Sequence, residues 1–120
     1  MSIILIVEDE KYIGQFMSIN LSMRGFDVLQ AETAQEGLEL LRKFAPQLLI
    51  VDIKLPDMSG WDMLKLIDKD PTVANLPVII TTALDLFEHQ NGYPYPNIVD
   101  KLIKPFDATD LLRAVGAVVS

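Results

Sequence analysis

Five short apolar runs recur along the chain, and longer stretches in which apolar residues follow a helical spacing separate them. The runs cover residues 3–7, 26–29, 48–51, 78–80 and 98–103. The first, third and fourth are nearly continuous and rich in branched aliphatic side chains. This pattern is typical of strands that are covered on both faces, as in a parallel sheet. We therefore expect five β-strands.

The stretches between the runs predict helices with defined ends. After the first run, apolar residues repeat at helical spacing and stop near Gly25, which suits a left-handed cap. Further helix starts are predicted at three polar residues, Thr33, Ser59 and Asp107. Thr33 and Glu36 together have the spacing of a capping box.

The connection between the fourth and fifth runs is different. Residues 84–91 allow two helical turns, but residues 92–97 (Gly-Tyr-Pro-Tyr-Pro-Asn) do not continue them. The two prolines lack amide donors and push the residues before them toward extended geometry. We expect a short or irregular fourth helix, followed by an ordered loop or a polyproline-like stretch.

Strand–helix alternation repeated five times predicts an α/β fold, a doubly wound open parallel sheet with helices on both faces. At 120 residues and 13.4 kDa, the chain is expected to form one domain over residues 1–120. In such folds the chemistry sits in the crevice beyond the carboxyl ends of the strands.

Composition narrows the class of protein. Half of the residues are apolar and 22% are charged, which excludes disorder for the chain as a whole. The net charge of -7 argues against direct nucleic-acid binding, which needs clustered Lys and Arg. Cysteine is absent, so disulfides and thiolate chemistry are excluded. Because residues 3–7 are too short to span a membrane and lack a basic flank, we expect a soluble, cytoplasmic protein.

Polar residues follow the predicted strands and should meet at one edge of the sheet. They are Glu8 and Asp9, Asp52, Thr81 and Thr82, and Lys104. Three carboxylates gathered without compensation would have sharply raised pKa values, and a hard cation is the natural compensation. Mg²⁺ fits, because it takes carboxylates, waters and phosphate oxygens as ligands.

Such a site suits phosphoryl transfer. A carboxylate such as Asp52 is ionised at neutral pH and needs no general base to act as a nucleophile. Lys104 supplies a positive charge for a phosphoryl oxygen, and the Thr82 hydroxyl supplies a neutral donor. Catalysis then consists mainly of positioning and electrostatics.

Four segments carry a resemblance to a known family. They are residues 4–10 (Ile-Leu-Ile-Val-Glu-Asp-Glu), residues 52–60 (Asp-Ile-Lys-Leu-Pro-Asp-Met-Ser-Gly), Thr82-Ala83 and Lys104-Pro105-Phe106. They resemble the receiver domain of two-component response regulators, over nearly the whole chain. The resemblance implies a flavodoxin-like, CheY-like fold with strand order 2-1-3-4-5.

The resemblance also implies a site and its partners. Asp52 would accept a phosphoryl group from a sensor histidine kinase or a phosphotransfer protein. Of the two threonines, the family pattern selects Thr82. Mg²⁺ would be held by Asp9, Asp52 and the backbone carbonyl of Lys54, and Glu8 would contribute mostly through a metal-bound water. Phosphorylation would then switch a contact with a downstream protein, since no effector domain follows in the sequence. Whether the chain forms a homodimer is left open.

Two features depart from the family pattern. Receivers usually carry Tyr or Phe three residues before the Lys-Pro pair, where this chain has Lys101. Residues 93–96 (Tyr-Pro-Tyr-Pro) stand where a fourth helix is usual, so the output face is expected to be remodelled. Tyr93 and Tyr95 are either a pair that docks a partner or parts of an ordered loop.

Two other functions compete with the phosphorylated switch. A phosphatase of the haloacid dehalogenase type also uses an aspartate nucleophile and magnesium, but it needs a second Asp where this chain has Lys54. A degenerate receiver that acts as a constitutive interaction module is favoured by Lys101 and the altered fourth helix. We expect no enzyme acting on a separate substrate, only self-phosphorylation and self-dephosphorylation. The apolar Leu84 predicts that the latter is slow.

Overall fold

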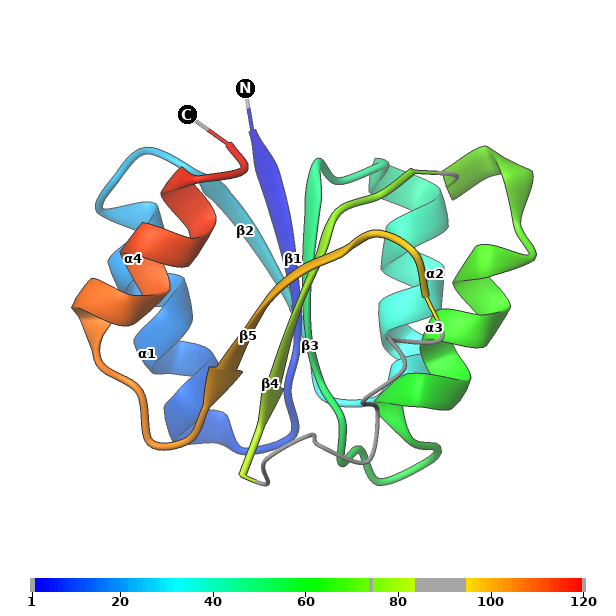
Figure 1. Ribbon diagram of the computed structural model, residues 1–120, viewed down its shortest axis with the longest axis horizontal. Helices are drawn as coiled ribbons and strands as arrows, with labels where there is room; N and C mark the ends of the chain where they lie inside the picture. The colour runs from blue at the N-terminus through cyan, green and yellow to red at the C-terminus, as the bar shows by residue number, and fades with distance from the viewer. Residues whose placement is uncertain (1, 74, 84–94, 120) are drawn as a thin grey trace.

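The computed structural model describes residues 2–73, 75–83 and 95–119. Its five strands form one sheet in the order β2-β1-β3-β4-β5, and all four neighbouring pairs are parallel. The strands are β1 (Ile3–Val7), β2 (Asp27–Ala31), β3 (Leu48–Asp52), β4 (Val78–Thr82) and β5 (Ile98–Ile103). All five predicted strands are present and the strand order is confirmed, although β2 begins one residue later than predicted and β2 and β4 each end two residues later (Figure 1).

Helices cover both faces of this sheet, as expected. The helices are α1 (Lys11–Ser22), α2 (Ala34–Phe44), α3 (Gly60–Asp68), the 3-10 turn η1 (Pro71–Val73) and α4 (Ala108–Gly116). Helices α1 and α4 lie on one face, and α2 and α3 lie on the other (Figure 1). The longest described helix has 12 residues, and none in the described part of the chain is long and apolar enough to cross a membrane.

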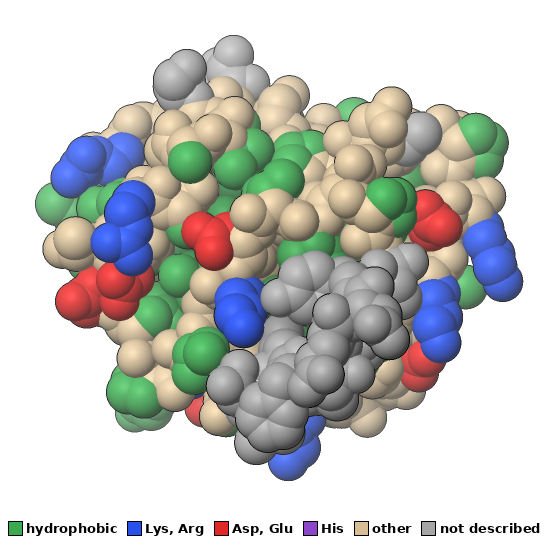
Figure 2. Space-filling view, in the orientation of Figure 1, with side chains coloured by type: hydrophobic (Ala, Val, Ile, Leu, Met, Phe, Trp, Pro, Cys, Tyr) green, Lys and Arg blue, Asp and Glu red, His purple; other side chains and the backbone are tan. Residues whose placement is uncertain are grey.

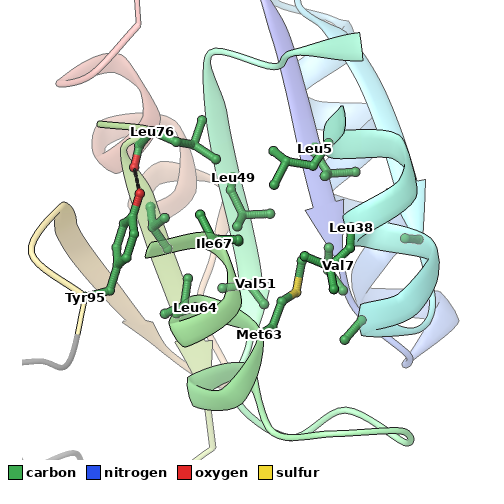
Figure 3. Close-up of a cluster of buried hydrophobic side chains, with 14 of the residues drawn as sticks. Leu5, Val7, Leu38, Leu49, Val51, Met63, Leu64, Ile67, Leu76 and Tyr95 are labelled. Carbon is green, nitrogen blue, oxygen red and sulfur yellow. Dashed lines mark hydrogen bonds between the residues drawn. The ribbon is translucent and has the colours of Figure 1, made fainter. Parts of the chain in front are cut away.

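The central strands contribute side chains to two separate hydrophobic cores, because successive side chains of a strand point to opposite faces of the sheet. In β1, Leu5 and Val7 join the cluster under α2 and α3, whereas Ile4 and Ile6 join the cluster under α1 and α4. Every residue of β3 is buried. Figure 3 shows how side chains from β1 and β3 meet those of α2 and α3 in the first cluster.

Polar caps fix where the helices begin. The Thr33 hydroxyl accepts a hydrogen bond from the Glu36 N–H at 3.1 Å, as predicted. The Glu36 carboxylate, however, accepts from the N–H of Glu32 at 3.0 Å, one residue before the cap, so the predicted capping box is shifted. Ser59 caps α3, and Asp107 caps α4 in a complete capping box.

Tyr95 lies in the core. Its side chain is only 3% exposed, and its hydroxyl donates a hydrogen bond to the backbone oxygen of Leu76 at 2.9 Å (Figure 3). A tyrosine held in this way cannot dock a partner, so that alternative was wrong for Tyr95. Residues 84–94 lie outside the described residues, so what the sequence predicts for the fourth helix, Leu84 and Tyr93 stays a prediction.

Candidate functional site

The register of the sheet brings the ends of four strands to one level. Val7 of β1 pairs with Val51 of β3, Asp52 pairs with Thr81 of β4, and Thr82 pairs with Ile103 of β5. The residues just beyond these pairs therefore meet at the carboxyl edge of the sheet, which is the lower edge in Figure 1. The polar residues predicted for the site all lie along this edge.

Lys104 is the centre of the cluster. Its Nζ lies 2.8 Å from Asp52 Oδ2, 2.9 Å from Glu8 Oε1 and 3.2 Å from Glu10 Oε1. The side chains of Glu8 and Asp52 are 1% and 5% exposed, whereas that of Glu10 is 61% exposed. One ammonium thus compensates two buried carboxylates and one at the surface.

The cluster shifts the protonation of its own members. Burial raises the pKa of Glu8 to about 7, although hydrogen bonds from Lys104 and from the Glu10 N–H act in the opposite direction. For Lys104, burial alone would lower the pKa, but its contacts with Asp52 and Glu8 outweigh burial and raise it. Lys104 therefore stays charged, and Glu8 is a group of the cluster that titrates near neutral pH.

Both oxygens of Asp52 have donors. Oδ2 faces Lys104, and Oδ1 accepts a hydrogen bond from the Lys54 N–H at 3.1 Å. Gly60 closes the loop that follows Asp52, because its N–H donates a hydrogen bond to the backbone oxygen of Ile53 at 2.7 Å. A Cβ atom at Gly60 would lie 2.5 Å from the backbone oxygen of Asp52, so only glycine fits this approach.

Asp57 ties the same loop to α2. Its two carboxylate oxygens accept hydrogen bonds from the N–H groups of Ala34 and Gln35, both at 2.9 Å. Desolvation by burial would raise the pKa of Asp57, but these backbone donors outweigh it and lower the pKa. Sequence reasoning missed this contact, because the only signal was an acidic residue in the loop and a helix start elsewhere in the chain.

The structure brings together Glu8, Asp52 and Lys104, as predicted, and adds Glu10. Carboxylate oxygens of Glu8, Glu10 and Asp52 all lie within 4.8 Å of one another, the one such group found within the described residues. Three oxygen donors at this spacing suit a hard cation such as Mg²⁺. The signal for Glu10 was present in the acidic run, since residues two apart point to one side of an extended chain.

The remaining predicted residues lie nearby without joining this group. Asp9 is exposed and lines a cavity of about 270 Å³, together with Asp52, Lys54 and Lys104. Thr82 is buried, and its backbone oxygen accepts a hydrogen bond from the Lys104 N–H at 2.8 Å. Lys101, at the position where receivers usually have an aromatic, lies in β5 opposite Ile80.

The fold and the site define a class before any relative is considered: a parallel sheet in this order with an acidic cluster and a lysine at its carboxyl edge is a CheY-like protein. A family model described as the response regulator receiver domain matches residues 4–116. The chain therefore belongs to the receiver domain family of two-component systems.

Solved structures agree with this assignment. The chemotaxis response regulator CheY4 of Vibrio cholerae superposes with a TM-score of 0.90 at 25% identity, covering 99% of each chain. A response regulator from Chloroflexus aurantiacus superposes with a TM-score of 0.86 at 28% identity, over 98% of this chain and 96% of that one.

Curated relatives differ in length. The protein PilH of Pseudomonas aeruginosa is 31% identical over 100% of this chain and 99% of its own. The DNA-binding dual master transcriptional regulator RpaA of Synechocystis is 34% identical over 97% of this chain but 48% of its own length. The transcriptional regulatory protein CusR of Escherichia coli is 35% identical, again over 48% of its length. This chain spans about half the length of these transcriptional relatives.

Proposed function

We propose that the chain is a phosphoacceptor switch in which Asp52 receives a phosphoryl group from a histidine kinase or a phosphotransfer protein. The observation that carries this proposal is the buried Asp52 carboxylate, which lies 2.8 Å from Lys104 at the carboxyl edge of the sheet. A buried aspartate held against a lysine beside further acids suits attack on phosphorus, since it is ionised without needing a base.

The transfer balances with groups that the proposal names. An oxygen of Asp52 forms a bond to phosphorus while the P–N bond of a phosphorylated histidine breaks, and the imidazole leaves with the electron pair and takes up a proton. Lys104, 11% exposed and held charged by its neighbours, stabilises the phosphoryl oxygens. The products are an aspartyl phosphate on this chain and a neutral histidine on the donor.

We propose Mg²⁺ as the cofactor, held by Asp52 with Glu8, Asp9 and the backbone carbonyl of Lys54. The geometric grouping of acids supports adding Glu10 to this set. When bound, the cation supplies charge neutralisation for the phosphoryl oxygens. This chain's own residues position the nucleophile: Lys104 holds one oxygen of Asp52, and the Lys54 N–H orients the other.

An apolar surface beside the site supports a helical protein as the phosphodonor. A cavity of about 500 Å³ borders Lys104 and is lined by side chains of α1 and of the loop before α4, among them Phe16 and Phe106. The exposed Tyr12 also lines this cavity, and the exposed Ile19 of α1 and Met23, the residue just after α1, follow it at the spacing of a helix seam. An Ile19→Glu variant should slow transfer from a kinase that serves the wild type and leave labelling by acetyl phosphate unchanged.

A direct contact with nucleic acid is not part of the proposal. On the face in Figure 2, the described Lys and Arg side chains are scattered among acidic ones and form no continuous basic patch. The net charge of -7 adds to this argument. The proposed output is a contact with another protein in the cytoplasm, and the chain acts on no substrate besides its own Asp52.

Labelling with acetyl phosphate in excess Mg²⁺ tests the proposal. Mass spectrometry should find one added phosphoryl group on Asp52, decaying slowly, and none on an Asp52→Asn variant. Asp62→Asn, an exposed aspartate on α3, serves as the control that retains labelling. Continuous hydrolysis of phosphate esters would point to a phosphatase instead. Absence of labelling would favour the constitutive interaction module, the candidate that Lys101 supports.

A further inference from the structure

The described part of the chain holds a buried hydroxyl that the proposed chemistry does not use. Thr81 is 0% exposed, and it pairs with Asp52 across the β3–β4 ladder. Paired residues of adjacent parallel strands point to the same face of the sheet and lie about 5 Å apart. Thr81 therefore lies beside Asp52.

The faces of the sheet separate Thr81 from Thr82. In β4, Ile79 joins the core under α1 and α4, whereas Ile80 joins the core under α2 and α3. Strand alternation then directs Thr81 to the α1–α4 face, together with Asp52, and Thr82 to the other face. The partner of Thr81 on β5, Leu102, belongs to the same α1–α4 core.

The Thr81 hydroxyl is unpaired in this state of the site. Within residues 2–73, 75–83 and 95–119, no group hydrogen-bonds to Thr81 Oγ1. A buried hydroxyl without a partner lowers stability, and valine has nearly the same shape without that cost. The hydroxyl is therefore better explained by a second state of the site, in which it has a partner.

Phosphorylation creates such a state. In the unmodified site the Lys54 N–H and Lys104 Nζ each donate to one oxygen of Asp52, and the Thr81 hydroxyl donates to neither. A phosphoryl group on Asp52 carries more negative charge than the carboxylate and draws the Lys104 ammonium toward itself. The Asp52 oxygen that faced Lys104 then lacks a donor.

We propose that Thr81 is a positioning residue for Asp52, whose hydroxyl donates a hydrogen bond to the Asp52 oxygen that Lys104 releases during phosphorylation. This inference rests on the proposed function. The step balances: the other oxygen of Asp52, Oδ1, bonds to phosphorus, the P–O bond of acetyl phosphate breaks, and acetate leaves with the electron pair, while Oδ2 remains free to accept the hydrogen bond. The Thr81 proton stays on Thr81 throughout and only changes its acceptor.

The Thr81 hydrogen bond therefore stabilises the transition state and the phosphorylated form more than it stabilises the unmodified form. Replacing Thr81 by valine removes the hydroxyl and keeps the shape. Thr81→Val should slow labelling by acetyl phosphate about 3- to 10-fold, the effect of one net hydrogen bond. It should weaken beryllofluoride binding in excess Mg²⁺ by a similar factor, measured through the fluorescence of the single tryptophan, Trp61.

Matched variants separate this role from packing. Thr81→Ser keeps the hydroxyl and should restore labelling and beryllofluoride affinity to nearly wild-type values. Ile79→Val, on the same face of β4 one pair away, trims the core without touching the site and should leave both unchanged. If Thr81→Val does not fold, the comparison of Thr81→Ser with Thr81→Ala makes the same distinction.

Two results would overturn the inference and leave the proposed function standing. Unchanged labelling and affinity in Thr81→Val, with a raised melting midpoint, would mean that the hydroxyl is only a tolerated cost. Equal losses in Thr81→Ser and Thr81→Val would mean that packing of the methyl group matters and the hydroxyl does not. A wild-type protein that accepts no label overturns the proposed function and this inference together, which distinguishes the two failures.

Discussion

Glu8 sets the pH response of the site at the scale of single residues. Burial raises its pKa from 4.5 to about 7, so the folded protein binds this proton more tightly than the unfolded chain does. The contribution to stability is fully present below pH 4.5 and is lost as the pH rises through about 7. The unmodified protein is therefore least stable at high pH, where the Glu8 carboxylate is ionised.

Replacing Glu8 by glutamine should therefore remove a pH dependence. Between pH 4.5 and 8, the wild type should lose about 3 kcal/mol of unfolding free energy relative to Glu8→Gln. Urea unfolding at a series of pH values, in the presence of a chelator, measures this difference. Glu39→Gln, an exposed residue of α2, should track the wild type, and a constant gap between wild type and Glu8→Gln would contradict the prediction.

Gly60 offers a second test at this scale. An alanine Cβ there would lie 2.5 Å from the Asp52 oxygen and 2.8 Å from the Ile53 Cα, both rigid backbone atoms. Gly60→Ala should cost about 3 kcal/mol of stability through overpacking and should also impair labelling of Asp52. Gly116→Ala is the matched control, since nothing lies within 4 Å of its Cβ, and it should stabilise by up to about 1 kcal/mol. Similar unfolding curves for both variants would refute the role assigned to Gly60.

At the scale of elements, the loop after β3 is shared between the site and α2. Lys54 donates to Asp52 at one end of the loop, and Asp57 accepts from the first amides of α2 further along. Helix α2 thus has two caps, its own Thr33 and the remote Asp57. A change in the loop on phosphorylation would reach the start of α2 through Asp57.

The remote cap can be measured on its own. Asp57→Ala should destabilise the protein by about 1 kcal/mol, a typical value for a lost N-terminal cap. Because the pKa of Asp57 is lowered in the fold, its contribution holds above the ordinary pKa of 3.8 and is lost as the pH falls below that value. Hydrogen exchange of the Ala34 and Gln35 amides should accelerate, whereas Asp62→Ala should leave both amides protected.

The elements were more predictable from sequence than the contacts between them. Continuous apolar runs and capping residues predicted the strands and helices, because burial and local hydrogen bonding depend on neighbours in the chain. The Asp57 contact depends on loops meeting in space. The choice of Glu10 over Asp9 for the cluster depends on how the chain leaves β1, and the burial of Tyr95 on a distant carbonyl, that of Leu76.

At the scale of the whole molecule, the acidic cluster adds to an overall negative charge of -7. Self-repulsion of this kind destabilises the compact state, so any salt stabilises the protein to some extent. A cation held at the site acts differently, because it binds the folded chain through oxygens that only folding brings within 4.8 Å of one another. The two effects can be separated by comparing salts and variants.

Mg²⁺ should raise the unfolding free energy beyond general screening. At ten times its dissociation constant, the expected gain is about 1.4 kcal/mol in wild-type protein, and it should be absent in Asp52→Asn. Thermal unfolding with MgCl₂ and with NaCl at matched ionic strength measures the specific part, since screening acts on both proteins alike. Glu10→Gln and Asp9→Asn then divide the ligand set, because the spacing of the carboxylates favours Glu10 and the family resemblance favours Asp9. An equal gain in wild type and Asp52→Asn would show that the cation only screens charge and is not held by the cluster.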